Sequence, residues 1–382
     1  MKIIVGGDIS HHTGRPGAFE TMIAYVIGLM RLGHDVYVFD DVDPKRCLDS
    51  HFEQVSFQEW DGRRKLEALL RAYGVWPRFC MIYNGGEQTY GLSFDEALRL
   101  AKSADLLFNT AGQLRTAAIL ESVRHRAFID EAPGKPQVWE FEYGIDCGIR
   151  NHDSFFSVGL NIGTAASKIP SGGFRWHGIV HPVALDLWPP QFDSDSRNFT
   201  TISNWAGKQT FNLDGQYSGE KSDSWRCFVG LPGLTSQPLE IALNIDPAYK
   251  DDIELFQQHG WILSDPSRIR TLEDYRSYIG GSRAEFSIAN QRYVEFNTGW
   301  TSDRTARYLA SGKPVLVQST GFEDKLPTGE GIVTFTTLEE ALAGIDEINS
   351  RYDEHCLAAR DIAERYFDSS KVLAQMIDQA GV

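Results

Sequence analysis

Two features that would place a chain in a membrane or in a secreted scaffold are missing from this sequence. Its longest apolar run, Met22 to Met30, is too short to span a bilayer and is better explained as one helix. Met1 to Asp8 is an apolar run that meets two glycines, which indicates a buried first strand and no signal peptide. The cysteines form no CxxC pair and have no histidine nearby at metal-ligand spacing: Cys47, Cys80, Cys147, Cys227 and Cys356. We therefore expect a cytoplasmic protein with free thiols, no bound metal and no membrane span.

Positive charge is also scarce. The 382 residues include 37 Lys and Arg against 52 Asp and Glu, a formal charge of −15, and the basic residues form no stripe. A phosphate backbone or an anionic membrane needs local positive charge, so we expect no nucleic-acid partner and no role at a membrane surface. The composition, with 42% apolar and 12% aromatic residues, is that of a folded enzyme, and the length favours two domains.

Short β-type runs alternate with helical patterns along the chain. The first half contains expected strands at Ile3–Val5, Val36–Phe39, Phe79–Tyr83, Asp105–Asn109 and Phe128–Asp130, and an expected helix at Ala18–Leu32. Prolines interrupt the pattern between residues 181 and 190, and it resumes with strands at Phe199–Ser203, Leu239–Leu243, Trp261–Leu263, Ala284–Ile288 and Pro314–Gln318. This alternation predicts an α/β protein with two Rossmann-like lobes that face a central cleft, with ligands at the carboxyl ends of the strands.

One turn has the form of a phosphate-binding helix start. In it a glycine precedes a helix whose N-cap is Thr301 or Ser302, and the open N–H groups of such a helix attract anions. Arg304 can add a two-pronged donor, although Asp303 could equally just complement the helix dipole beside a solvated arginine. The candidate ligand-binding residues of this turn are Gly299, Trp300, Thr301, Ser302, Asp303, Arg304 and Thr305.

The residues after this turn resemble a known motif. Ser311-Gly312-Lys313-Pro314-Val315 resembles a region near the end of GT-B glycosyltransferases. The segments 282–289 and 318–321 resemble a largely uncharacterised branch of the family 1/4-like enzymes, near the spore-maturation type. Retaining members of the broader family carry a Glu-x7-Glu pair here, whereas this chain has Gly299 and Arg307 at the aligned positions. The stereochemical outcome is therefore open.

The resemblance implies a GT-B fold and a division of labour within it. Residues 1–187 would form an acceptor-binding lobe, 188–365 a lobe that binds a nucleoside-diphosphate sugar, and 366–382 a helix that packs back on the first lobe. Lys221 would reach the donor diphosphate, and backbone groups of Leu263 and Ser264 would cradle the base. Trp205 and Trp300 are candidates for stacking on the base or sugar.

The resemblance also bears on cofactors and partners. GT-B sites typically stabilise the leaving diphosphate without a metal, so we discount Asp41-Val42-Asp43 although it matches the D-x-D of metal-dependent enzymes of another fold. No cofactor is expected. The expected ligands are a donor, with a UDP type favoured, and a small-molecule or glycan acceptor, and a homodimer is compatible with the sequence.

The loop after the first strand supplies candidates for a catalytic base. Attack by an acceptor hydroxyl benefits from a base that titrates near neutrality, and histidine is such a group. His12 is favoured over the adjacent His11, and Asp8 could orient it. Glu131 follows a later strand and could serve instead, because burial would raise its pKa.

Three other functions compete with a glycosyltransferase. Asp40 ends the second strand as a ribose-binding acid of a dinucleotide enzyme would, but the glycines of the first loop do not fit G-x-G-x-x-G. A nucleotide-sugar epimerase or hydrolase of the same fold would need no acceptor. A non-catalytic nucleotide-sugar-binding protein would keep the fold without the chemistry.

Overall fold

The computed structural model describes residues 1–49, 51–193, 195–206 and 210–382, and its first sheet occupies the N-terminal half. In the described residues this sheet has eight strands in the order β4-β3-β2-β1-β5-β6-β7-β8, and all neighbours are parallel except β3 and β4. The strands are β1 (Lys2–Gly7), β2 (Asp35–Val42), β3 (Phe79–Tyr83), β4 (Gln88–Gly91), β5 (Leu106–Thr110), β6 (Arg126–Asp130), β7 (Ser154–Ser157) and β8 (Trp176–Gly178). The connecting helices are α1 (Pro16–Arg31), α2 (Gly62–Ala72), α3 (Phe94–Ser103), α4 (Ala117–Leu120) and α5 (Lys135–Phe141).

The second sheet is built from the C-terminal half. Its six described strands are all parallel, in the order β13-β12-β9-β14-β15-β16. They are β9 (Phe199–Asn204), β12 (Leu239–Asn244), β13 (Ile262–Ser264), β14 (Ala284–Ser287), β15 (Val315–Gln318) and β16 (Ile332–Phe335), beside a small hairpin of β10 (Asn212–Leu213) and β11 (Gln216–Tyr217). The helices of this half are α6 (Lys221–Cys227), α7 (Lys250–Gln258), α8 (Leu272–Gly280), α9 (Gln291–Glu295), α10 (Asp303–Ala310), α11 (Leu338–Ser350) and α12 (Tyr352–Ile362).

Both sheets reverse their winding direction at a central strand. In the first, the chain moves outward from β1 to β2 and β3, then returns to the other side of β1 with β5. In the second sheet, β9 is the central strand, as β1 is in the first, and β14 lies on the other side of it, as β5 lies beside β1. This is the doubly wound order, in which a crevice opens at the carboxyl ends of the two strands beside the reversal. The loops after β1, β9 and β14 are therefore the places where a ligand is expected.

Buried apolar strands account for this architecture. β1 and β3 read as continuous apolar runs and are buried along almost their whole length, as strands covered by helices on both faces must be. α1 starts at Pro16, whose fixed φ suits a first helical position, and after its end Gly33 adopts a φ of 83°. The predicted alternation of strands and helices is therefore confirmed.

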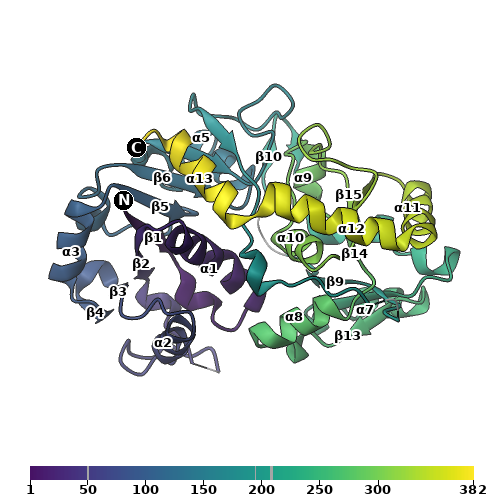
Figure 1. Ribbon diagram of the computed structural model, residues 1–382, viewed down its shortest axis with the longest axis horizontal. Helices are drawn as coiled ribbons and strands as arrows, with labels where there is room; N and C mark the ends of the chain where they lie inside the picture. Colours follow the sequence, from purple (N-terminus) through teal and green to yellow (C-terminus); the bar gives the residue numbers. More distant parts are fainter. Residues whose placement is uncertain (50, 194, 207–209) are drawn as a thin grey trace.

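The chain crosses between the lobes twice, and the two crossings lie side by side. Val183 pairs with the segment at Asp368: its N–H donates to the Phe367 carbonyl at 2.8 Å, and its carbonyl accepts from Ser369 at 2.9 Å. After this point α13 (Ser369–Ala380) packs against α1 of the first lobe. Figure 1 shows α12 and α13 in yellow, running from the second lobe across to the first.

The structure contains elements that sequence patterns did not predict. β4, β7, β8 and β16 are short, and only Phe155 and Phe156 of β7 would have signalled a strand there. Helix α6 is also short: residues 218–220 before it are not helical, and it ends at Cys227. Within the described ranges no helix is both long and apolar enough to cross a bilayer.

Candidate functional site

A cleft of about 1050 Å³ lies between the lobes. The first lobe contributes the loop after β1, the start of α1, and Glu131 directly after β6. The second lobe contributes residues that end or follow β9, β12 and β14, among them Asn204, Asn244 and Asn290. The cleft therefore lies where the two winding reversals meet, which is the expected place for a ligand.

His12 and Asp8 form a hydrogen-bonded pair on the first-lobe wall. His12 Nε2 lies 3.0 Å from Asp8 Oδ1, and Arg46 Nη1 donates to Asp8 Oδ2 at 2.7 Å. Burial alone would raise the pKa of Asp8, but the hydrogen bonds and charges of His12 and Arg46 outweigh it and lower that pKa. The carboxylate is thus ionised and accepts from Nε2–H, so the lone pair of a neutral His12 lies on Nδ1. That atom is buried and has no partner among the described residues.

His11 lies apart from this pair. Its ring packs against Trp60, with the centroids 5.0 Å apart, and it is absent from the cleft wall. Burial lowers its pKa to about 4, and the charge of Arg46 acts in the same direction. Adjacent residues of the short turn Ile9–His12 face different surroundings, so the structure brings His12 but not His11 to the cleft.

Glu131, His181 and Asp303 meet on the cleft wall. Burial raises the pKa of Glu131 to about 8, and the charges of Asp303 and Asp8 act in the same direction. Asp303 behaves in the opposite way: burial would raise its pKa, but His181 and nearby arginines outweigh this and lower it. Thr21 of α1 donates to Asp303 Oδ2 across the lobes at 3.2 Å. Two carboxyl groups of one site thus differ in protonation, with Glu131 neutral and Asp303 ionised near pH 7.

Two cations line the second-lobe wall. Lys221 opens α6, and burial lowers its pKa to about 7, helped by the charge of Arg304. Arg304 is itself committed to the protein: it donates to Glu285 Oε1 at 2.7 Å, to the Ile202 carbonyl at 2.6 Å and to Ser287 Oγ at 2.8 Å. Arg304 is therefore a buried, fixed charge beside the cleft rather than a flexible clamp, and Lys221 is the more adaptable cation.

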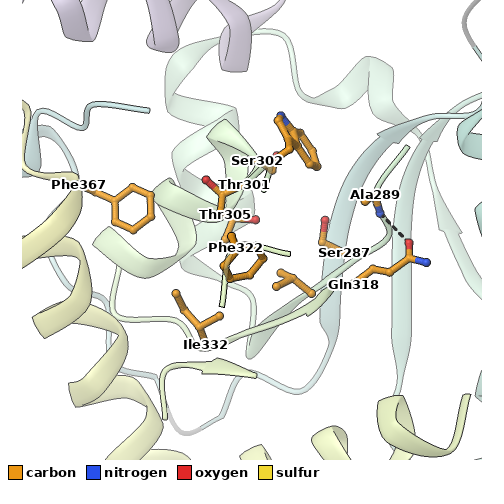
Figure 2. A pocket seen from close by; sticks show the side chains of 11 residues that line it. Ser287, Ala289, Thr301, Ser302, Thr305, Gln318, Phe322, Ile332 and Phe367 are labelled. Atoms are coloured by element: carbon orange, nitrogen blue, oxygen red, sulfur yellow. Dashed lines mark hydrogen bonds between the residues drawn. The ribbon is translucent and has the colours of Figure 1, made fainter. Parts of the chain in front are cut away.

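The predicted phosphate-binding turn is divided between two cavities. Trp300, Asp303 and Arg304 line the large cleft, whereas the side chains of Thr301, Ser302 and Thr305 line a separate cavity of about 10 Å³. Figure 2 shows these three beside Phe322, Ile332 and Phe367. Ser302 caps α10 by accepting from the Arg304 N–H at 3.2 Å, as expected for an N-cap. The small cavity holds about one water and no nucleotide.

Gly299 has a structural task in this turn. Its φ is 69°, a conformation that side chains disfavour, and its N–H donates to the Thr320 carbonyl at 2.7 Å. Its carbonyl accepts from Leu160 of the first lobe at 3.2 Å. The N–H of this candidate binding residue is thus already used in the protein.

Trp205, Leu263 and Ser264 do not line the cleft in the described residues. Trp205 is buried, packs edge-on against Phe256 and lies under the Arg226 guanidinium. It is a core residue, as most tryptophans are. Leu263 and Ser264 belong to edge strand β13, and Pro266 and Ser267, which follow one residue after the strand ends, reach the cleft instead.

Several cleft residues were missed by the sequence analysis. Tyr293 stacks on Trp300 with centroids 4.4 Å apart and planes at 24°, and the Arg292 guanidinium lies 4.7 Å from the Tyr293 ring centre. Asn290 follows strand β14. The rule that polar residues after strands face the cleft would therefore have found it. His181 lies outside the regular elements, and no sequence signal marked it.

The two aspartates of the D-x-D sequence cap turns. Asp41 accepts from the N–H groups of Arg115 and Thr116 at 2.8 and 2.7 Å, and Asp43 accepts from the Lys45 N–H at 2.8 Å. Across the described chain no three His, Cys, Asp or Glu side chains are grouped to hold a metal ion. Asp40, the ribose-binding residue of the dinucleotide alternative, is buried and accepts from the Ser10 N–H at 3.2 Å.

Comparison with known proteins identifies the fold. No protein-family model and no curated protein sequence matches the chain. An alpha-glucosyltransferase in complex with UDP and DNA is similar in structure, with 12% identity, a TM-score of 0.62 and full coverage of both chains. HepE from Anabaena in complex with UDP-glucose has 13% identity and a TM-score of 0.60, over 100% of this chain and 99% of that one. These are GT-B glycosyltransferases, so the predicted GT-B fold is confirmed. At such identities the likeness shows the fold alone.

Proposed function

We propose that this protein is a glycosyltransferase that moves a sugar from a nucleoside-diphosphate sugar, with a UDP type favoured, to an acceptor hydroxyl. The observation that carries the proposal is the pairing of two walls across one cleft. The second-lobe wall presents Lys221 and the fixed charge of Arg304, and the first-lobe wall presents the His12–Asp8 pair. The two cations of the second-lobe wall suit a diphosphate, and the His12–Asp8 pair of the first-lobe wall suits deprotonation of a hydroxyl. The UDP and UDP-glucose bound by the structural neighbours support the donor class.

The chemistry of a direct displacement can be assigned to these residues. The acceptor oxygen would form a bond to the anomeric carbon while the bond from that carbon to the diphosphate oxygen breaks. The leaving diphosphate keeps the electron pair, and Lys221 stabilises the added charge. His12 Nδ1 takes the hydroxyl proton, and ionised Asp8 stabilises the imidazolium from the other side of the ring. We propose that this reaction needs no metal and that the first lobe binds the acceptor.

Substitution of His12 tests the proposal. Purified protein is incubated with UDP-glucose and a panel of acceptor alcohols, with and without EDTA, while release of UDP is followed and donor affinity is measured by calorimetry. We expect His12→Ala to reduce turnover by about 10²- to 10⁴-fold, the scale of a lost general base, and to change donor affinity by less than about threefold. His51→Ala, at an exposed histidine outside the cleft, is the control.

Each alternative predicts a different result. Donor binding without UDP release in either protein would favour a non-catalytic binding protein, and a change in the sugar without an acceptor would favour an epimerase. Equal loss of turnover and affinity in His12→Ala would mean that His12 positions the donor. Binding of NAD without any binding of UDP-glucose would refute the donor class.

A further inference from the structure

Acidic and imidazole side chains crowd one part of the cleft, where the two lobes meet. Glu131 comes from the first lobe, Asp303 opens α10 of the second, and His181 lies between the two sheets in sequence. His12, held by Asp8, also lines the cleft. Charge interactions couple Glu131 to Asp303 and to Asp8, and Asp303 to His181. Glu131, Asp303, His181, His12 and Asp8 are together called the acid cluster.

Polar atoms of the acid cluster are left without partners. His181 is 4% exposed and its Nδ1 has no hydrogen-bond partner in the described chain. The same holds for Glu131 Oε1 and His12 Nδ1. Buried polar atoms are nearly always paired, and three unpaired atoms in residues that line one cleft point to a ligand that supplies the missing hydrogen bonds.

The acid cluster offers mainly hydrogen-bond acceptors. Asp303 is ionised, and among the described residues its carboxylate oxygens accept only from the hydroxyls of Thr21 at 3.2 Å and Ser302 at 3.4 Å. His12 presents a lone pair on Nδ1, because Nε2 carries the proton shared with Asp8. A ligand that fits this wall must bring O–H donors of its own.

The two arginines whose charges lower the pKa of Asp303, Arg307 and Arg304, both donate to other groups of the protein. Arg307 is 1% exposed and donates to the Asp303 carbonyl at 2.8 Å, and it is absent from the cleft wall. Arg304 is committed to Glu285, Ser287 and a carbonyl. A carboxylate brought by a ligand would therefore meet ionised Asp303 without a free guanidinium from Arg304, and Arg307 does not line the cleft.

We propose that the acid cluster holds the transferred sugar and selects a neutral, hydroxyl-bearing sugar over one that carries a carboxylate, with Asp303 as the specificity-determining residue. This inference rests on the proposed nucleotide-sugar chemistry and adds the class of sugar. Hydroxyl groups of the sugar donate to Asp303, whereas a uronic acid has no donor at its carboxylate and is repelled by Asp303.

Calorimetry with three donors tests the inference: UDP, UDP-glucose and UDP-glucuronate, which differ only in the sugar. We expect wild-type protein to bind UDP-glucuronate at least about tenfold more weakly than UDP-glucose, because like charges meet in a partly desolvated site. Asp303→Asn keeps an oxygen that can accept from Thr21 and should reduce this ratio to about threefold or less. Asp186→Asn, an exposed position outside the cleft, removes the same charge and should leave the ratio unchanged.

The outcomes separate this inference from the function on which it rests. Failure of UDP and of both UDP-sugars to bind would refute the proposed function. Normal binding of UDP with equal or tighter binding of UDP-glucuronate would overturn the sugar selectivity alone. An unchanged ratio in a folded Asp303→Asn protein, checked by circular dichroism, would remove Asp303 from the explanation. The wild-type comparison needs no variant, so it decides the selectivity even if Asp303→Asn does not fold.

Discussion

Lys221 is the group whose protonation should follow donor binding most closely. It lines the cleft at the start of α6, and burial, together with the charge of Arg304, lowers its pKa to about 7. A diphosphate placed against the ammonium group favours the charged form and raises that pKa again. Donor binding should therefore take up a proton from solvent.

The size and sign of this uptake follow from the pKa. For a group with a pKa of about 7, roughly nine in ten molecules are neutral at pH 8 and about one in ten at pH 6. Binding should take up close to one proton at pH 8 and almost none at pH 6. Because the pKa of Lys221 is higher in the complex than in the free protein, the affinity for the donor has its full value below pH 7. Above pH 7 it falls by up to about tenfold per pH unit, until the pH reaches the pKa of Lys221 in the complex.

Calorimetry in two buffers with different ionisation enthalpies measures the uptake directly. UDP-glucose is the suitable ligand, because its doubly esterified diphosphate has no proton that titrates near neutrality. Lys221→Met should abolish the uptake and weaken binding by about 1.5–3 kcal/mol, the scale of a charged hydrogen bond. Lys250→Met, at an exposed lysine outside the cleft, should change neither quantity. An uptake that persists in Lys221→Met, or that is absent from wild type at pH 8, would refute the reasoning.

Two further predictions concern stability. Arg304→Met leaves the buried Glu285 carboxylate without its cation and should lower the free energy of unfolding in urea by about 3–5 kcal/mol, whereas Arg304→Met with Glu285→Leu should recover most of it; a single variant that loses less than about 1 kcal/mol would contradict this. Gly28→Ala would place a Cβ against Leu373 and Ser369 and should cost about 1–3 kcal/mol by overpacking α1 against α13. Gly233→Ala, with open space around the position, is the control, and equal unfolding energies for both variants would refute the packing argument.

The fold could be predicted because its strongest signals are local. β3 coincides with its prediction at Phe79–Tyr83, since a continuous apolar run bounded by polar residues has one explanation in a parallel sheet. β8, Trp176–Gly178, could not be predicted, because three residues carry no periodicity. It exists because the edge of β7 accepts a further strand, and that is tertiary information.

The site residues, too, could be predicted only as far as local signals reach. Loops after strands were predicted to face a cleft, and this rule placed His12 and Glu131 on its wall. Lys221, which also lines the cleft, was expected there only from the resemblance to GT-B enzymes. The rule says nothing about which side of a loop a side chain occupies. His11 packs on Trp60 while its neighbour reaches the cleft, and Thr301 faces a small cavity while Trp300 borders both. Three-dimensional packing decides these choices.

The structure also shows why Arg304 is a poor sole test of donor binding. The sequence predicted a two-pronged clamp for a diphosphate, with an expected loss of about 1.5–3 kcal/mol in affinity on its removal. Because three of its N–H groups already bind Glu285, Ser287 and a carbonyl, its removal disturbs the wall of the cleft as well as any ligand contact. A loss of affinity in that variant would not distinguish the two causes, whereas Lys221 has no such commitment in the described structure.

The missing Glu-x7-Glu pair has a structural counterpart that bears on which group acts as the base. Arg307 stands at one of the two positions, buried close to Glu131, His181 and Asp303. It lowers the pKa of Asp303 and partly offsets the rise at Glu131, whose pKa of about 8 still keeps most of that carboxyl protonated at pH 7. A protonated carboxyl cannot accept the acceptor's proton. His12 can, because ionised Asp8 fixes the tautomer that leaves its Nδ1 lone pair free. Of the predicted bases, the geometry thus favours His12, whereas the protonated Glu131 carboxyl can donate a hydrogen bond.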